Sequence, residues 1–153
     1  MSCRTKHNRH GVQLVATLTL RVARPVSQLE RSRELYQSGL GLDVIGAFED
    51  HHGFNGVMLG KAGIPWHLEF TQCTSHPVIP SPSAEDLLVL YLPERDEWQQ
   101  TCQQMISAGF KQVSSFNPYW DQNGKTYEDH DGYRTVIQCQ QWPQPSACLN
   151  VYK

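Results

Sequence analysis

Two predicted strands carry polar side chains at alternating positions, where these side chains would share one face of a sheet. HLEFTQ places His67 and Glu69 two residues apart, and EDHDGYRTVIQ (Glu128–Gln138) places Arg134 and Gln138 four residues apart. Residues at even spacing along a strand point to the same face. A histidine can transfer a proton near neutral pH, and a guanidinium binds anions. These residues are therefore candidates for acid–base and ligand-binding chemistry.

The other histidines and the cysteines lack the spacing of a catalytic or metal site. His51 and His52 are adjacent in a glycine-containing loop, where we expect them to be exposed, with a lid as the functional alternative. His76 falls in a proline-rich linker, and His130 lies in a turn between two acids, which predicts an exposed side chain. The five cysteines include no CxxC pair, so we expect reduced thiols in a cytoplasmic protein. The sequence also lacks G-x-S-x-G and Walker-type loops.

The composition is that of a globular domain. The chain has 153 residues, a formal net charge of −2 and 39% hydrophobic residues. This balance predicts no general attraction to nucleic acid, and the sequence contains no apolar run long enough for a membrane helix. The basic start, residues 1–12, is interpreted as a flexible tail because no apolar stretch of a secretory signal follows it.

The first half of the chain has the element order β-α-β-β-β. The apolar residues between Val26 and Leu40 recur at helical spacing, Ser27 is a candidate cap, and Gly41 follows as a helix stop. Runs rich in Val, Leu, Ile and Phe predict the strands, which are Val12–Val22, Leu42–Phe48, Val57–Leu59 and His67–Gln72.

The same order recurs after a Pro- and Ser-rich linker. Strand Asp86–Leu92 is followed by a helix that ends at Gly109, and then by three more predicted strands, Lys111–Phe116, Lys125–Glu128 and Tyr133–Gln140. GLDVIGAF (Gly41–Phe48) also aligns with GFKQVSSF (Gly109–Phe116). The repeat predicts an α+β fold of two βαβββ modules. The expected boundaries are a tail at 1–12, modules at 13–73 and 85–142, a linker at 74–84 and an extension at 143–153.

Three stretches carry a family resemblance. Leu20–Leu42 and HLEFTQ (His67–Gln72) look like the opening and closing of a first module, and EDHDGYR (Glu128–Arg134) is similar to a D-P-D-G-[YW] turn with His130 in place of proline. In this order and spacing the chain resembles the vicinal oxygen chelate superfamily. The resemblance implies that each module is a curled mixed sheet with a helix outside and that the two modules together enclose a cleft. That superfamily includes glyoxalase I, extradiol dioxygenases, and fosfomycin- and bleomycin-resistance proteins.

The resemblance implies four ligands for a divalent metal, one from each of four strands. Its positions fall on Arg21, Glu69, Leu87 and Val136, of which only Glu69 is a metal-binding type. Leucine and valine have no donor atom, and arginine is a permanent cation. One carboxylate does not make a tight site for nickel, zinc or iron. We therefore expect no metal cofactor.

The resemblance also implies the lining of the cleft. Alternation from the four positions gives Arg21, His67, Glu69, Tyr91, Arg134 and Gln138, with Tyr119 and Trp120 of NPYW at the rim. Arg21 and Glu69 are expected within hydrogen-bond reach, either as a structural ion pair that replaces the metal or as an anion site oriented by Glu69. Structural interpretations stay open for His67 as a hydrogen-bonded histidine, for Tyr91 as a core residue and for Arg134 as a solvated side chain.

Two classes of function fit these residues. The first is a metal-independent, homodimeric small-molecule binding protein of the bleomycin-resistance type, with no nucleic-acid or membrane partner. The second is a glyoxalase-like lyase, isomerase or dioxygenase in which Glu69 and His67 are the catalytic candidates, with Glu69 as the base and Arg21 stabilising an anionic intermediate.

Overall fold

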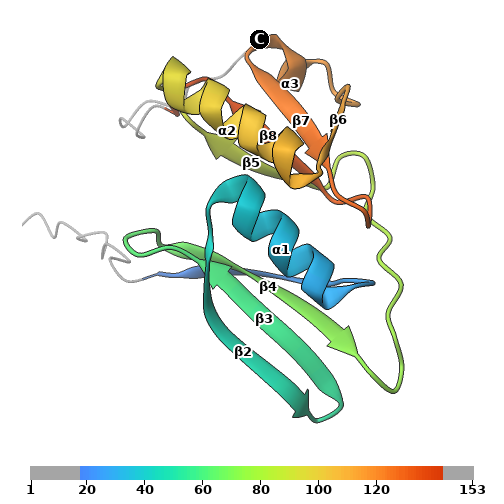
Figure 1. The fold of residues 1–153 in the computed structure, drawn as a ribbon. Helices are drawn as coiled ribbons and strands as arrows, with labels where there is room; N and C mark the ends of the chain where they lie inside the picture. Colours follow the sequence, from blue (N-terminus) through green and yellow to red (C-terminus); the bar gives the residue numbers. More distant parts are fainter. Residues whose placement is uncertain (1–17, 143–153) are drawn as a thin grey trace, which may run out of the picture.

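The computed structural model describes residues 18–142, which form two modules with the same element order (Figure 1). The first module consists of β1 (Leu20–Pro25), α1 (Leu29–Leu40), β2 (Asp43–His51), β3 (Phe54–Gly60) and β4 (Trp66–Cys73). The second consists of β5 (Leu87–Tyr91), α2 (Arg95–Ala108), β6 (Lys111–Val113), α3 (Tyr119–Gln122), β7 (Gly124–Glu128) and β8 (Arg134–Gln138). The predicted α+β fold of two βαβββ modules is confirmed.

The two sheets have equivalent topologies. Their strand orders are β1-β4-β3-β2 and β5-β8-β7-β6. In each sheet the first strand pairs in parallel with the last, and the other pairs are antiparallel. Arg21 lies opposite His67 in the first sheet, and Leu87 lies opposite Arg134 in the second. These matching registers support the internal duplication.

Helix α1 forms where small and large residues alternate on one face. Its buried residues, Ser32, Leu35, Tyr36 and Gly39, recur at spacings of three and four. The helix ends at Gly41, whose φ of 65° is a left-handed conformation that suits glycine. The predicted cap at Ser27 was wrong, because the N-cap position is Gln28 and the Ser27 hydroxyl bonds Asp131 of the second module instead.

One hydrophobic core serves both modules. Helices α1 and α2 pack against each other between the two sheets (Figure 1). Gly39 makes the close approach possible, because a Cβ there would lie 2.7 Å from Cε2 of Phe110 and 3.0 Å from Sδ of Met105. The Tyr36 ring lies 4.8 Å from that of Phe70 and 5.1 Å from that of Phe110, which joins residues of both modules.

The turn between β7 and β8 joins the second module to the first. The Tyr36 hydroxyl donates to Asp129 Oδ2 at 2.8 Å, and the backbone N–H of Ser27 donates to Asp131 Oδ2 at 3.0 Å. The Tyr133 hydroxyl donates to the Pro25 carbonyl at 2.9 Å. The EDHDGYR stretch, the most specific part of the resemblance, therefore bonds the two modules together.

Several predicted boundaries change. Strand β1 begins at Leu20 and runs through Pro25, which is tolerated because β1 is an edge strand; the earlier part of the predicted strand Val12–Val22 lies outside the described residues. Strand β6 ends at Val113 and not at Phe116, since the N–H of Ser115 turns to the Asp121 carboxylate of α3. The predicted tail and C-terminal extension also lie outside the described residues. None of the helices in residues 18–142 is long and apolar enough to cross a membrane.

Candidate functional site

Arg21, His67 and Glu69 form a polar cluster on one face of the first sheet. Arg21 donates from Nε to His67 Nε2 at 2.7 Å and from Nη1 to Glu69 Oε2 at 2.6 Å. The Arg21 side chain is 50% exposed and that of Glu69 is 14% exposed. The predicted contact between Arg21 and Glu69 is confirmed. The register of β1 on β4 explains it, because Arg21 lies opposite His67 and two positions from Ala23, the partner of Glu69, so the three side chains share one face.

These contacts indicate which nitrogen of His67 carries the proton and how the Arg21 guanidinium is oriented. Because Arg21 donates to Nε2 of His67, that nitrogen presents its lone pair and the neutral ring carries its proton on Nδ1. The guanidinium has five N–H groups, so roughly three remain after these two bonds. His67 and Glu69 orient Arg21, and its remaining donors can bind a carboxylate, a phosphate or a carbonyl oxygen.

Apolar side chains lie on the same face beside the cluster. Met58 lies opposite Glu69 in the register, and Ile45 approaches Gly60 at the position where a Cβ would also meet Cβ of His67. The Phe48 ring covers Gly56. The face therefore combines one oriented cation with an apolar surface, and Ile45 is 55% exposed.

The second-module candidates lie on a different face. Arg134 donates from Nε to Glu128 Oε2 at 3.0 Å, which makes it part of an ion pair. Gln138 is 1% exposed, and the Tyr91 ring lies 5.7 Å from that of Trp142. The rim candidates Tyr119 and Trp120 belong to α3, with ring centroids 5.0 Å apart. We expected these two residues in a loop at the rim of the cleft and did not predict the short helix that carries them.

The chain does not bring the Arg21 cluster and the candidates of the second module together. Val22, Leu68, Leu88 and Ile137 belong to the shared core, so the helix-side faces of both sheets point toward each other. By alternation, the face with Arg21 and the face with Arg134 point away from that core on opposite sides. Across residues 18–142, no hydrogen bond or ion pair connects the Arg21 cluster with Arg134 or Gln138.

The four positions that the superfamily uses for a metal do not fit one here. Val136 is fully buried, and neither it nor Leu87 has a donor atom. Arg21 places a guanidinium on Glu69, the retained acid. Within the described part of the chain, no group of three or more His, Cys, Asp or Glu residues could hold a metal ion.

His130 differs most from its sequence interpretation. Its side chain is 6% exposed, so the predicted exposed turn histidine was wrong. Nε2 lies 3.3 Å from the Ser32 hydroxyl and 3.4 Å from Asp131 Oδ2, because α1 of the first module packs over the turn. His51 and His52 are exposed, as predicted, and the His76 ring bonds Ser75.

Comparisons with known proteins give the family. Residues 20–71 match the YycE-like N-terminal domain, and residues 85–139 match the YycE-like C-terminal domain. The uncharacterised protein YycE of Bacillus subtilis strain 168 is 41% identical over 118 residues, which are 77% of this chain and 85% of that protein. A crystal structure of a YycE protein of unknown function from Bacillus subtilis superposes with a TM-score of 0.78 at 37% identity, over 85% of this chain and 95% of that one.

More distant structures share the fold. The trypanothione-dependent glyoxalase I of Leishmania major has a TM-score of 0.61 at 17% identity, over 78% of this chain and 84% of that one. The fosfomycin-resistance protein FosX of Mesorhizobium loti has a TM-score of 0.60 at 8% identity, over 79% and 90%. The chain belongs to the YycE-like family, which has the fold of the vicinal oxygen chelate superfamily.

Proposed function

We propose that this protein binds a small anionic or carbonyl-bearing molecule without a metal, at the face that carries Arg21, His67 and Glu69. One observation carries the proposal: the guanidinium of Arg21 stands at a metal-ligand position of the fold and is bonded to the retained acid, Glu69. The positive charge of Arg21 thus replaces the charge that a metal ion would supply at this position of the fold. The adjacent apolar residues offer a surface for the body of the ligand.

The proposal includes a cytoplasmic homodimer. By alternation the Arg21 face and the Arg134 face both lie on the side of their sheet away from the shared core, so neither is covered by the other module. Within the second face, Val136 and Gln138 are already buried by their own module. In a symmetric dimer the second-module face of one chain would lie over the Arg21 face of its partner. Tyr91 and Arg134 would then join the lining, which restores the composition expected from the resemblance.

The test combines metal content with ligand binding. We expect no stoichiometric metal by elemental analysis, and no change in thermal midpoint on adding EDTA, nickel, zinc or iron. In a thermal-shift screen of small carboxylates and phosphates, hits should depend on Arg21. Arg21→Met should abolish their shift, while Arg95→Met, which removes an exposed cation from the start of α2, should not. Stoichiometric metal, or a large midpoint shift on adding one, would overturn the proposal.

An enzyme is the second candidate. Glu69 is a partly buried carboxylate beside a cation, an arrangement in which it could abstract a proton while Arg21 stabilises the resulting oxyanion. His67 is less suited to act as the base at Nε2, because that lone pair accepts from Arg21. Turnover of a screened ligand that is lost in Glu69→Gln while binding is retained would favour the enzyme over the binding protein.

A further inference from the structure

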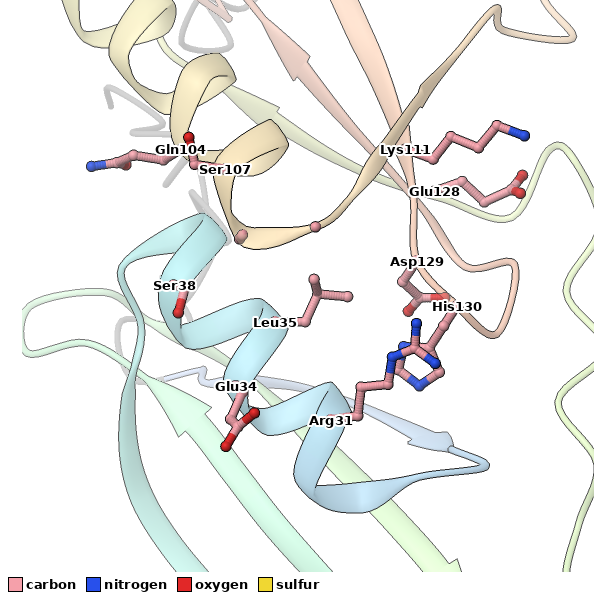
Figure 2. A pocket seen from close by; sticks show the side chains of 12 residues that line it. Arg31, Glu34, Leu35, Ser38, Gln104, Ser107, Lys111, Glu128, Asp129 and His130 are labelled. Atoms are coloured by element: carbon pink, nitrogen blue, oxygen red, sulfur yellow. The ribbon is translucent and has the colours of Figure 1, made fainter.

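Two of the cavities at the junction of the modules have linings of opposite character. The larger, of about 630 Å³, lies beside α1, the last turn of α2 and the β7–β8 turn, and charged side chains of both signs surround it (Figure 2). Its lining therefore favours no single class of ligand. The smaller, of about 410 Å³, has no charged side chain among the described residues that line it. We call the smaller one the apolar cavity.

The apolar cavity reaches from the surface down to the shared core. Its floor includes Leu42, which is 4% exposed, and Ile137, which is fully buried. Its walls are half-buried side chains of both modules, among them Leu40 and Trp66 of the first and Tyr91 of the second. The cavity is thus a deep indentation between the modules and not a flat apolar patch.

A second chamber extends the apolar cavity along β5. It measures about 160 Å³ and shares four lining residues with the first chamber, namely Leu40, Trp66, Val89 and Leu90. No described residue that lines it is charged. All five residues of β5, LLVLY, are only half-buried. An apolar molecule in the two chambers would remove this surface from water, which is favourable.

Aromatic rings and one hydroxyl give the apolar cavity some chemical specificity. Trp66 and Tyr91 line it, and the half-exposed Trp142 ring lies 5.7 Å from the Tyr91 ring at the rim. Thr101 of α2 adds a hydroxyl to an otherwise apolar wall. Flat aromatic molecules pack well against such rings, and a hydroxyl can fix the orientation of one polar group.

We propose that the apolar cavity binds a small, uncharged, mainly aromatic molecule that carries a hydrogen-bonding group. Its rings lie on Leu42 and Ile137 between Trp66 and Tyr91, and its polar group bonds the Thr101 hydroxyl. The volume is within the range of small-molecule sites. An ion is excluded because a charge that is buried without a partner is costly.

This site is separate from the Arg21 face. Trp66 precedes His67 on β4, so the two side chains point to opposite faces of the first sheet. Trp66 packs against the shared core, whereas His67 bonds Arg21. The chain therefore offers an uncharged site between its modules in addition to the cationic site proposed above.

The shape of the apolar cavity favours a small molecule over a second copy of the chain. An occupant must enter between the modules to contact Leu42 and Ile137. An edge strand or a sheet face of another chain would cover the rim and leave this floor empty. A small ring system can reach it.

The first test is an NMR titration of the full chain, labelled at the isoleucine methyl groups, with 2-naphthol, which is uncharged at neutral pH. Ile64 and Ile137 line the cavity, so their signals should move together along one binding curve. Ile45, on the Arg21 face, and Ile106, on the exposed side of α2, should not move. No movement of Ile64 and Ile137, or movement of Ile45 in their place, would overturn the proposal.

The second test uses variants of the cavity. Leu40→Trp places a larger side chain beside both chambers and should weaken the affinity for 2-naphthol at least about tenfold. Ile106→Trp makes a matched change at a 44% exposed position outside the lining and should leave the affinity unchanged. Equal affinities in these two variants would overturn the proposal.

Thr101→Val is nearly isosteric, so it tests the site even if Leu40→Trp does not fold. It should weaken the affinity for 2-naphthol about two- to tenfold, the usual effect of losing one neutral hydrogen bond. An unchanged affinity would overturn the role of the Thr101 hydroxyl.

The third test addresses charge and the second copy as an occupant. 2-Naphthoate has the same rings with a carboxylate, and it should bind the cavity at least about tenfold more weakly than 2-naphthol. Equal affinities would overturn the uncharged class of ligand. The 2-naphthol titration is also repeated over a range of protein concentrations, with sedimentation to follow association. An affinity that does not depend on association supports the proposal, whereas one that falls as chains associate would assign the cavity to a protein contact and overturn it.

Discussion

The hydroxyl of Tyr36, in the first module, donates to Oδ2 of Asp129, in the second, at 2.8 Å. Both side chains are buried, and burial raises the pKa of the Tyr36 phenol well above its ordinary value. The phenol therefore remains a donor under all ordinary conditions. This bond is a buried polar link between the modules, which are also joined by the bonds of Ser27 with Asp131 and of Tyr133 with the Pro25 carbonyl.

Tyr36→Phe should weaken the joint between the modules. The change leaves Oδ2 of Asp129 buried without its donor, so we expect a loss of about 1–3 kcal/mol in the free energy of unfolding. Tyr119→Phe is the matched control, because Tyr119 is 46% exposed, and it should change stability by less than about 0.5 kcal/mol. Denaturant titration measures both, and equal stabilities would contradict the expectation.

The Asp129 carboxylate predicts that the stability of the fold depends on pH. Burial raises the pKa of Asp129 above its ordinary value of 3.8, although bonds from Tyr36 and two backbone N–H groups oppose the rise. The folded chain thus binds a proton at the Asp129 carboxyl group more tightly than the unfolded chain does. The resulting stabilisation is complete below pH 3.8 and is lost as pH rises through the folded pKa. Asp129→Asn removes the titratable group. The free energy of unfolding of the wild type, relative to that of the variant, should therefore increase on acidification. A difference that is constant with pH would argue against this.

Local sequence patterns predicted much of the fold, and the family resemblance predicted the ion pair of the candidate site. Helix spacing and Gly41 defined α1, whereas Arg21 and Glu69 were expected together because both fall on metal-ligand positions of the superfamily. The failures involve distant partners. Ser27 bonds Asp131, which is 104 residues away, and His130 is buried against Ser32, which is 98 residues away. Both contacts depend on how the modules pack, which no local pattern contains.

Gly39 is a test of the helix–helix contact. Alanine has a good helix propensity, so Gly39→Ala would ordinarily stabilise a helix. Here the added methyl would meet the Phe110 ring at 2.7 Å and Met105 Sδ at 3.0 Å, so these side chains, or the helix that carries Gly39, must shift. We expect a net loss of about 1–3 kcal/mol in the free energy of unfolding. Ser38→Ala, an exposed neighbour in the same helix, should be neutral or slightly stabilising. A more stable Gly39→Ala variant would show that the contact is looser than described.

The Arg21–Glu69 pair should contribute little to stability. Arg21 is half exposed, and solvent screens the attraction, so a double-mutant cycle with Arg21→Gln and Glu69→Gln should give a coupling of about 1 kcal/mol or less. A small coupling alongside a large loss of ligand binding would favour the binding role of Arg21. A coupling above about 3 kcal/mol would favour the purely structural ion pair.

The thiols should differ in reactivity according to their surroundings. A hydrogen bond with the Ser75 hydroxyl, supported by the backbone of His76, lowers the pKa of Cys73, while burial raises that of Cys102. The thiolate is the reactive form, so we expect iodoacetamide at neutral pH to alkylate Cys73 at least about tenfold faster than Cys102. Peptide mass mapping over time follows each site separately. Ser75→Ala should slow the reaction at Cys73 and leave Cys102 unchanged, whereas equal rates at the two cysteines in the wild type would contradict the contrast in their environments.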